Sequence, residues 1–264
     1  MKSTFRWKKL LAPGAATVIS LSMVAAMTVS DATAAPAAKK ARTASHGAVV
    51  TLAEGAQGTP NYIMPFVTGA NNAEANINLQ YQMWPTLYTI STTTSVNAIN
   101  STLSLAAPPV YSDGNTQVSV TLKPWKWSDG TPLTARDVTF FMNILKVEKT
   151  KWSSWAPGNM PTNVVSWTTK GTSTVVFKLD KAYNPTWFTD TELANIVPMP
   201  QQAWDKESAT GAVGTYDTTA AGAKAVYTFL KKAGEDTATY DTNPLWQVVD
   251  GAWKMKQYTS NSFV

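Results

Sequence analysis

The amino-acid sequence predicts an α/β fold in which strands and helices share one mixed α+β body. The chain of 264 residues is 44% hydrophobic and 15% charged, a balance typical of a globular protein with a sizeable core. Apolar residues alternate at 118–122 and 173–179, and they recur with helical spacing at 134–147 and 220–233. Because these segments do not follow a strict strand–helix–strand order, we expect a mixed sheet.

The first 34 residues have the composition of a secretory signal peptide. Positions 1–9 carry four basic residues and no acid, and an apolar run follows from Leu10 to Ser30. Ala32-Thr33-Ala34 then offers the small-x-small pattern of a cleavage site, so residues 1–34 are expected to be removed on export. An uncleaved membrane anchor is the alternative, because about 20 apolar residues can span a bilayer.

An Ala- and Lys-rich linker is expected at residues 35–48. It carries Lys39, Lys40 and Arg42, and together with the leader it contributes more positive charge than the whole net charge of +5. From Gly47 onward, 15 basic residues stand against 16 acidic ones. We therefore expect a nearly neutral folded part, without the basic surface of a nucleic-acid-binding protein.

The next expected elements surround a loop with large apolar side chains. Residues 47–53 have the pattern of a buried strand, and two prolines make 59–66 (Thr-Pro-Asn-Tyr-Ile-Met-Pro-Phe) an irregular loop. A helix is expected over 71–84, with Asn72 as its N-cap. Its apolar face is predicted to contain Ile77, Tyr81 and Trp84.

The strand at 118–122 leads into a turn and a helix start. Ser128-Asp129-Gly130 supplies the turn, because Gly130 can adopt a positive φ without strain. Thr134 is the expected N-cap, and Asp137, three residues later, completes a capping box. The helix over 134–147 is predicted to bury Val138, Phe141, Met142 and Leu145.

The C-terminal half is predicted to contain a strand, connecting loops, a long helix and a closing segment. After the strand at 173–179, loops and a short helix are expected within 183–188 and 198–204. The helix over 220–233 is predicted to bury Val226, Phe229 and Leu230. Residues 246–249 (Trp-Gln-Val-Val) have a strand-like pattern, Asp250-Gly251 form a turn, and an edge strand is expected to start at 260–264.

Residues 127–141 (Trp-Ser-Asp-Gly-Thr-Pro-Leu-Thr-Ala-Arg-Asp-Val-Thr-Phe-Phe) resemble the signature of family 5 of the ABC-transporter extracytoplasmic solute-binding proteins. Members of this peptide-binding family carry Trp-Ser-Asp-Gly-Thr-Pro followed by Ala-x-Asp-Val. The opening strand with its loop, residues 81–88 and residues 244–255 are similar to further segments of the family. Ala252 stands where the family commonly has proline. The resemblance covers most of residues 49–264.

The resemblance implies a periplasmic-binding-protein-like, type II two-lobed architecture. Family members are longer, continuing into a second lobe and then crossing back to the first. We therefore expect residues 49–264 to be the N-terminal part of the solute-binding domain, with an inserted subdomain at about 85–190. On this interpretation the second lobe is absent from the chain, and the architecture is incomplete.

The resemblance also implies where a ligand would bind. The expected cleft-lining residues lie in the first-strand loop and near the C-terminus: Asn61, Tyr62, Ile63, Met64, Trp246, Asp250 and Gly251. Core packing is the alternative for Ile63, Met64 and Trp246. The signature residues Trp127, Ser128, Asp129, Gly130, Thr134 and Asp137 are expected to be structural.

The sequence offers few residues for catalysis or metal binding. It has no cysteine and a single histidine, His46 in the linker, which removes thiolate nucleophiles, His-based triads and the common zinc motifs. Acidic pairs such as Asp190 with Glu192 and Asp205 with Glu207 lie in polar stretches and are expected at the solvated surface. A glycosidase-like site stays open as an alternative, because two acids that are distant in sequence can lie close together in space. We predict no enzymatic activity, no cofactor and no metal.

The predicted function is capture of peptides outside the membrane and their delivery to an ABC permease. The protein is expected to be exported, monomeric, not lipidated because it has no cysteine, and without nucleic-acid partners. Each buried peptide group left unpaired costs about 1–3 kcal/mol, so main-chain hydrogen bonds suit a broad peptide site. Two alternatives stay open. One is an oligosaccharide-binding member of the family, using some of the 11 tryptophans, and the other is a truncated secreted interaction or sensory module without transport.

Overall fold

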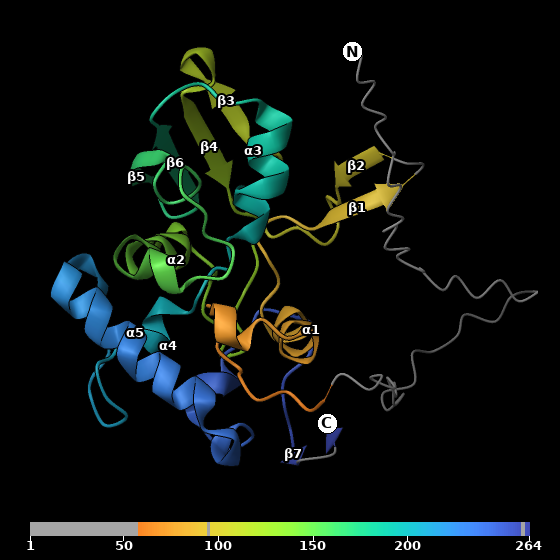
Figure 1. Cartoon of the computed structure of the whole chain (residues 1–264), viewed down its shortest axis with the longest axis vertical. Coiled ribbons are helices and arrows are strands. Elements are labelled where there is room, and N and C mark those ends of the chain that lie inside the picture. The colour runs from red at the N-terminus through yellow and green to blue at the C-terminus, as the bar shows by residue number, and fades with distance from the viewer. Residues whose placement is uncertain (1–57, 94–95, 260–261) are drawn as a thin grey trace, which may run out of the picture. The chain divides into compact units, whose positions relative to one another are not determined.

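The computed structural model describes residues 58–93, 96–259 and 262–264 (Figure 1). The predicted signal peptide, the linker and the predicted strand at 47–53 lie outside the described residues. Within the described ranges, no helix is long and apolar enough to cross a membrane.

A four-stranded antiparallel sheet has the order β3 (Val110–Ser112), β4 (Gln117–Thr121), β6 (Thr174–Leu179), β5 (Val164–Lys170). β4 and β6 pair in its centre, with Val118 opposite Phe177 and Val120 opposite Val175. These four side chains are buried, so the alternation that predicted the two strands is confirmed as the core-facing pattern. β3 and β5 were not predicted. β5 exposes most of its side chains, so its sequence lacks a clear alternation.

Two short hairpins complete the strands of the described residues. β1 (Ile90–Thr93) pairs with β2 (Val96–Ile99), and β7 (Tyr258–Thr259) pairs with β8 (Ser262–Phe263). The first hairpin extends to one side of the sheet (Figure 1). Strands and helices alternate irregularly along the chain, which confirms the predicted fold class with both element types in one body. The expectation of a mixed sheet was wrong for the described strands, because all of their pairings are antiparallel.

Helix α2 (Ala135–Glu148) begins at the predicted capping box. The Thr134 N–H donates to Asp137 Oδ2 at 2.8 Å, and the Thr134 hydroxyl lies 3.0 Å from the same oxygen. The apolar face predicted for this helix is buried. α2 packs on β5 and β6 on one side and on α5 (Ala220–Glu235) on the other (Figure 1). In α5, Val226 and Leu230 are buried as predicted, while Phe229 is only half-buried.

Helix α1 (Glu74–Met83) is shorter than predicted, and of its predicted apolar face Trp84 is buried, Ile77 is half-buried and Tyr81 is exposed. Its N-cap is Ala73, whose side chain makes no capping bond, so the prediction of Asn72 as the cap was wrong. Tyr81, predicted on the buried face, is 51% exposed. The buried face carries Asn76 and Gln80 among apolar residues, because these two amides hold the neighbouring loop.

The remaining helices are short. α3 (Pro185–Thr191) lies beside the sheet, next to β3 and β4 (Figure 1), and α4 (Gln201–Trp204) packs near α2. Single turns of 3₁₀ helix occur at Gly69–Asn71, Asp113–Asn115, Lys149–Lys151, Leu193–Asn195, Tyr216–Thr218, Thr237–Thr239 and Pro244–Gln247. The last of these replaces the strand predicted at 246–249, which was wrong. Asn243 caps this turn, since its Oδ1 accepts from the Leu245 N–H at 3.1 Å, and Pro244 occupies the first position.

Most large aromatic rings fill the core. Trp84, Trp127, Trp204 and Trp246 are almost completely buried, whereas Trp187 and Trp253 are exposed. Phe66 packs edge-on against Tyr227 and lies 5.8 Å from Phe141, ring centre to ring centre. Much of the tryptophan content is therefore explained by core packing.

Candidate ligand-binding site

The loop at residues 59–66 is held in place by two amide side chains of α1. Asn76 Oδ1 accepts from the N–H groups of Asn61 at 2.8 Å and Tyr62 at 3.1 Å. Gln80 Nε2 donates to the carbonyls of Tyr62 at 3.0 Å and Met64 at 3.1 Å. Because backbone groups in an irregular loop have no strand partner, these bonds let the loop enter the core without unpaired polar groups.

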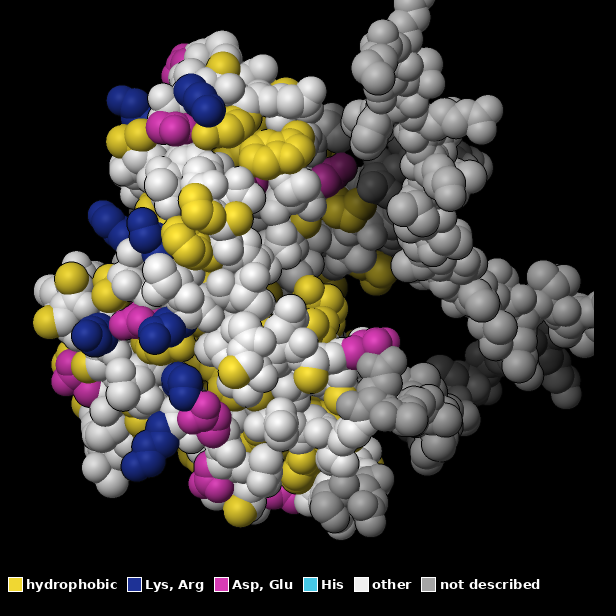
Figure 2. Space-filling view, in the orientation of Figure 1, with side chains coloured by type: hydrophobic (Ala, Val, Ile, Leu, Met, Phe, Trp, Pro, Cys, Tyr) yellow, Lys and Arg dark blue, Asp and Glu magenta, His cyan; other side chains and the backbone are white. Residues whose placement is uncertain are grey.

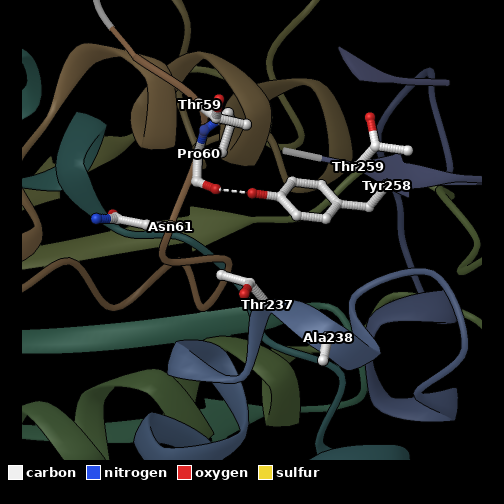
Figure 3. A pocket seen from close by; sticks show the side chains of 7 residues that line it. All are labelled: Thr59, Pro60, Asn61, Thr237, Ala238, Tyr258 and Thr259. Atoms are coloured by element: carbon white, nitrogen blue, oxygen red, sulfur yellow. Dashed lines mark hydrogen bonds between the residues drawn. The ribbon is translucent and has the colours of Figure 1, made fainter. Parts of the chain in front are cut away.

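A pocket of about 420 Å³ opens beside this loop (Figure 3). Three segments far apart in sequence line it, and they are Thr59–Asn61, Thr237–Ala238 and Tyr258–Thr259. The Tyr258 hydroxyl donates to the Pro60 carbonyl across one wall, and Thr237 and Ala238 face this wall from the helical turn on the other side (Figure 3). All lining residues are uncharged, so the pocket presents hydroxyl, amide and methyl groups.

Tyr258 is fixed from three sides. Its N–H donates to Asp241 Oδ2 at 3.1 Å, and its ring packs edge-on against Tyr240 with 4.9 Å between ring centres. The Tyr240 hydroxyl in turn donates to the Gly234 carbonyl at 2.7 Å, the same oxygen that accepts the Ile63 N–H at 3.1 Å. The C-terminal hairpin, the end of α5 and the 59–66 loop are thus joined around the pocket.

A second group of predicted site residues lies in the segment 245–251, which is packed into the core. Trp84, Trp204 and Trp246 meet edge to face, with ring centres 5.3 to 6.2 Å apart. The indole N–H groups of Trp84 and Trp204 donate to the carbonyls of Val248 and Leu245 at 2.9 and 2.8 Å. This tryptophan trio therefore holds the segment through both ring packing and hydrogen bonds.

The signature residues also fasten this segment. The Ser128 N–H donates to the Val249 carbonyl at 2.7 Å, and its hydroxyl donates to the Gln247 carbonyl at 2.8 Å. Asp137, besides capping α2, accepts from the Gln201 N–H at 3.0 Å and from Trp127 Nε1 at 3.4 Å. The turn at Gly130 has a φ of +89°, and Asp129 Oδ1 accepts from the Thr131 N–H at 2.8 Å. These contacts are those of a scaffold joining α2, α4 and the 245–251 segment.

Asp250 is a buried carboxyl without a donor. It is 4% exposed, and among the described residues neither of its oxygens accepts a hydrogen bond from another residue. Burial raises the pKa of Asp250 well above its usual range, and the nearby charge of Asp137 raises it further. The protonated form of this carboxyl is therefore favoured in the folded state.

Replacing Asp250 by asparagine is expected to raise the melting temperature at neutral pH. In the unfolded chain an aspartate titrates near about pH 4. Since the folded pKa is higher, the contribution of Asp250 to stability is greatest below that pH and is lost as the pH rises. The gain in Asp250→Asn should thus shrink toward zero as the pH falls to about 4, as measured by thermal melts across a pH series. Asp236→Asn, at an exposed residue, is the control, and equal effects of both changes would contradict the assignment.

The predicted site residues therefore lie in two environments. Asn61 lines the pocket, although its side-chain amide points away from Tyr258, and its Oδ1 accepts from Asn76 Nδ2 at 3.0 Å (Figure 3). Tyr62, Ile63, Met64 and Trp246 are fully buried, and Asp250 is nearly so. Gly251 lies against the end of α1, where its N–H donates to the Met83 carbonyl at 2.8 Å. That the buried residues line a ligand cleft stays a prediction.

Sequence reasoning missed most of the pocket lining. Thr237, Ala238, Tyr258 and Thr259 carry no charge pattern, and they belong to no recognisable motif. Among the described residues, no group of three or more His, Cys, Asp or Glu side chains could hold a metal ion. The chemistry available at the pocket is binding through neutral polar groups.

Comparison with known proteins gives a family match. Residues 102–264 match the family model described as "Bacterial extracellular solute-binding proteins, family 5 Middle". The search of curated protein sequences found no match.

Three solved structures resemble the fold. The oligopeptide-binding protein AppA from Bacillus subtilis, in complex with a nonapeptide, is 17% identical, with a TM-score of 0.50 and coverage of 77% of this chain and 33% of that chain. The substrate-binding protein CtaP from Listeria monocytogenes is 20% identical, with a TM-score of 0.51 and coverage of 77% and 33%. OppA from Haemophilus influenzae, in complex with RPPGFSPFR, is 18% identical, with a TM-score of 0.51 and coverage of 78% and 35%.

The chain spans about a third of the length of these solved proteins. At these identities the structural likeness establishes the fold, and the family model, which matches more than half of the chain, establishes the relationship. This protein belongs to family 5 of the bacterial extracellular solute-binding proteins.

Proposed function

We propose that this protein captures peptides outside the membrane and delivers them to the permease of an ABC importer. Family membership carries the proposal. It is supported by the peptides bound to AppA and OppA, whose folds this chain resembles. As in other ligand-binding components, the role is recognition and release, without a chemical step on the ligand.

The pocket beside the 59–66 loop is the proposed contact region for the peptide. Its lining consists of uncharged residues, and the Thr237 hydroxyl is among its polar groups. Such groups can pair with peptide N–H and C=O groups, which are common to all sequences, and they do not select a charged side chain. A pocket of this kind would suit a site that accepts many peptides.

The domain organisation is also a proposal. Residues 1–34 act as a signal peptide, 35–48 as a linker and 49–264 as the N-terminal part of the solute-binding domain. The sheet formed by β3 to β6 lies within the proposed inserted subdomain at about 85–190. The peptide would be enclosed when a second lobe, of the kind found in the longer relatives, closes over the pocket.

Filling the pocket at Ala238 is expected to weaken peptide binding. Ala238→Trp places a large ring among the lining residues, and the expected loss of affinity is at least about tenfold, or about 1.4 kcal/mol. The measurement is calorimetric titration of the purified protein with a mixture of short peptides, followed by mass spectrometry of the retained species.

The matched control is Ala182→Trp, the same change at an exposed alanine outside the pocket. Both variants should keep the melting temperature of the unmodified protein. Equal peptide affinity in the two variants would mean that peptides do not bind at this pocket. Retention of oligosaccharides in place of peptides would favour the sugar-binding alternative, and retention of neither would favour a module without a transport role.

A further inference from the structure

The surface of the folded part has a larger excess of basic over acidic residues than the sequence of that part has. The buried acids are Asp137, Glu148, Glu192, Asp205, Asp217 and Asp250. In contrast, every lysine of the described residues is exposed or half-buried. The near balance of acids and bases in the sequence therefore hides an excess of positive charge at the surface, because part of the negative charge lies inside.

Part of this positive charge lies in a stretch of the chain without acids. Between Lys149 and Leu179 the sequence has four lysines and no acid. The segment runs from the end of α2 through β5 to β6, and Lys146 precedes it in the last turns of α2. Figure 2 shows Lys and Arg side chains along the left of the molecule, over the sheet, α2 and α5.

Two half-buried tryptophans lie among these lysines. Lys146 Nζ lies 5.5 Å from the ring centre of Trp167, and Lys149 Nζ lies 5.9 Å from that of Trp155. Lys151 is exposed beside them. We call these five residues the tryptophan–lysine surface. Among the described residues, no ion pair involves its three lysines.

The rings of this surface are held in fixed orientations. Trp167 Nε1 donates to Asn143 Oδ1 at 3.0 Å, and Asn143 Nδ2 donates to the buried Asp217 at 2.8 Å. Trp155 Nε1 lies 3.5 Å from the Thr162 hydroxyl. The structure thus presents two oriented indoles beside three ammonium groups, and ordering the two rings costs little conformational entropy on binding.

We propose that the tryptophan–lysine surface docks the protein on an anionic phospholipid membrane. Ammonium groups attract anionic headgroups, and indole rings lie favourably at the boundary between headgroups and acyl chains. A soluble polyanion would satisfy the lysines and leave the indole faces without an apolar partner, so a lipid surface fits both components. Docking would keep the binding protein near the membrane, whatever ligand it carries.

The test is flotation of the purified protein with phosphatidylcholine vesicles that contain or lack phosphatidylglycerol. Binding is expected only to the anionic vesicles, and it should weaken as salt is added. Each lysine near an anionic surface contributes roughly fivefold in affinity, so reversing three lysines should lower binding by roughly 100-fold or more. The variant is Lys146→Glu with Lys149→Glu and Lys151→Glu, and Lys151→Glu alone is the milder form should the triple variant unfold.

The matched control reverses three exposed lysines outside this surface, Lys126, Lys254 and Lys256. It changes the net charge equally and should retain most of the binding. Trp155→Ala should reduce the binding that persists in salt, whereas Trp253→Ala, at a tryptophan that is 52% exposed, should not. Equal loss in the two triple variants, binding to neutral vesicles, or binding to soluble polyphosphate without binding to vesicles would each overturn the proposal.

Discussion

Gly251→Ala is expected to destabilise the fold by about 3 kcal/mol or more, because the new methyl group has no room. A Cβ at this position would lie 2.2 Å from the Gln82 carbonyl oxygen and 2.8 Å from the carbonyl carbons of Gln82 and Met83. These are backbone atoms at the end of α1, so no side-chain rotation relieves the contact. The Gly251 N–H also donates to the Met83 carbonyl at 2.8 Å, which holds the two backbones together.

The measurement is a denaturant or thermal unfolding curve, since natural domains are stable by only about 5–15 kcal/mol. Gly69→Ala is the control, because a Cβ there would meet no atom within 4 Å and its φ is not positive. The comparison also separates two roles for Gly251. If it acts only in a ligand cleft, alanine would lower ligand affinity and leave the melting temperature unchanged.

The elements predicted correctly are those whose signal is local. Val118 and Val120 alternate with polar residues in β4, and the capping box of Thr134 and Asp137 marks the start of α2. Such patterns depend only on neighbouring residues, so they predict the element correctly without knowledge of its tertiary contacts. The family signature is of the same kind, and its residues have scaffold contacts.

The errors arise where polar residues have tertiary partners. Hydrophobic periodicity placed Tyr81 inside and overlooked Asn76 and Gln80, whose burial depends on a loop more than ten residues away. The strand predicted at 246–249 was favoured by β-branched residues, although Asn243 and Pro244 are a helix start. The helical turn is favoured here because its Asn243 cap pairs the backbone N–H of Leu245.

The pocket could not be predicted from sequence because its lining has no distinguishing chemistry. Thr59–Asn61, Thr237–Ala238 and Tyr258–Thr259 are brought together by the pairing of Tyr258 with Pro60 and Tyr240. Of the residues that line the pocket, only Asn61 was among the predicted site residues. A neutral, polar lining has neither the charge pattern nor the periodicity that sequence analysis detects.

Arg136→Met is expected to destabilise the protein by about 3 kcal/mol or more, because it removes the cation from a buried acidic pair. Arg136 Nη1 donates to Asp217 Oδ2 at 2.7 Å, and its Nη2 donates to Asp217 Oδ1 and lies 3.5 Å from Asp205 Oδ2. Both acidic side chains are fully buried, whereas that of Arg136 is 30% exposed. Burial, together with the adjacent Asp217, raises the pKa of Asp205 to about 6. Even with Arg136 present, ionisation of Asp205 beside Asp217 is therefore less favourable than that of a solvent-exposed aspartate.

The loss should be largest at neutral pH, where Asp205 carries its charge, and smaller below about pH 6, where protonation of Asp205 removes one unpaired charge. Lys231→Met is the matched control. It removes a cation from the exposed pair with Glu235, which should cost less than about 1 kcal/mol. Adding Asp217→Asn to Arg136→Met should recover part of the stability, because the orphaned charge disappears, and urea titrations of the double-mutant cycle measure this recovery. A double variant less stable than the sum of the single changes would mean that Asp217 stabilises the fold mainly through Asn143, to which it is bonded at 2.8 Å.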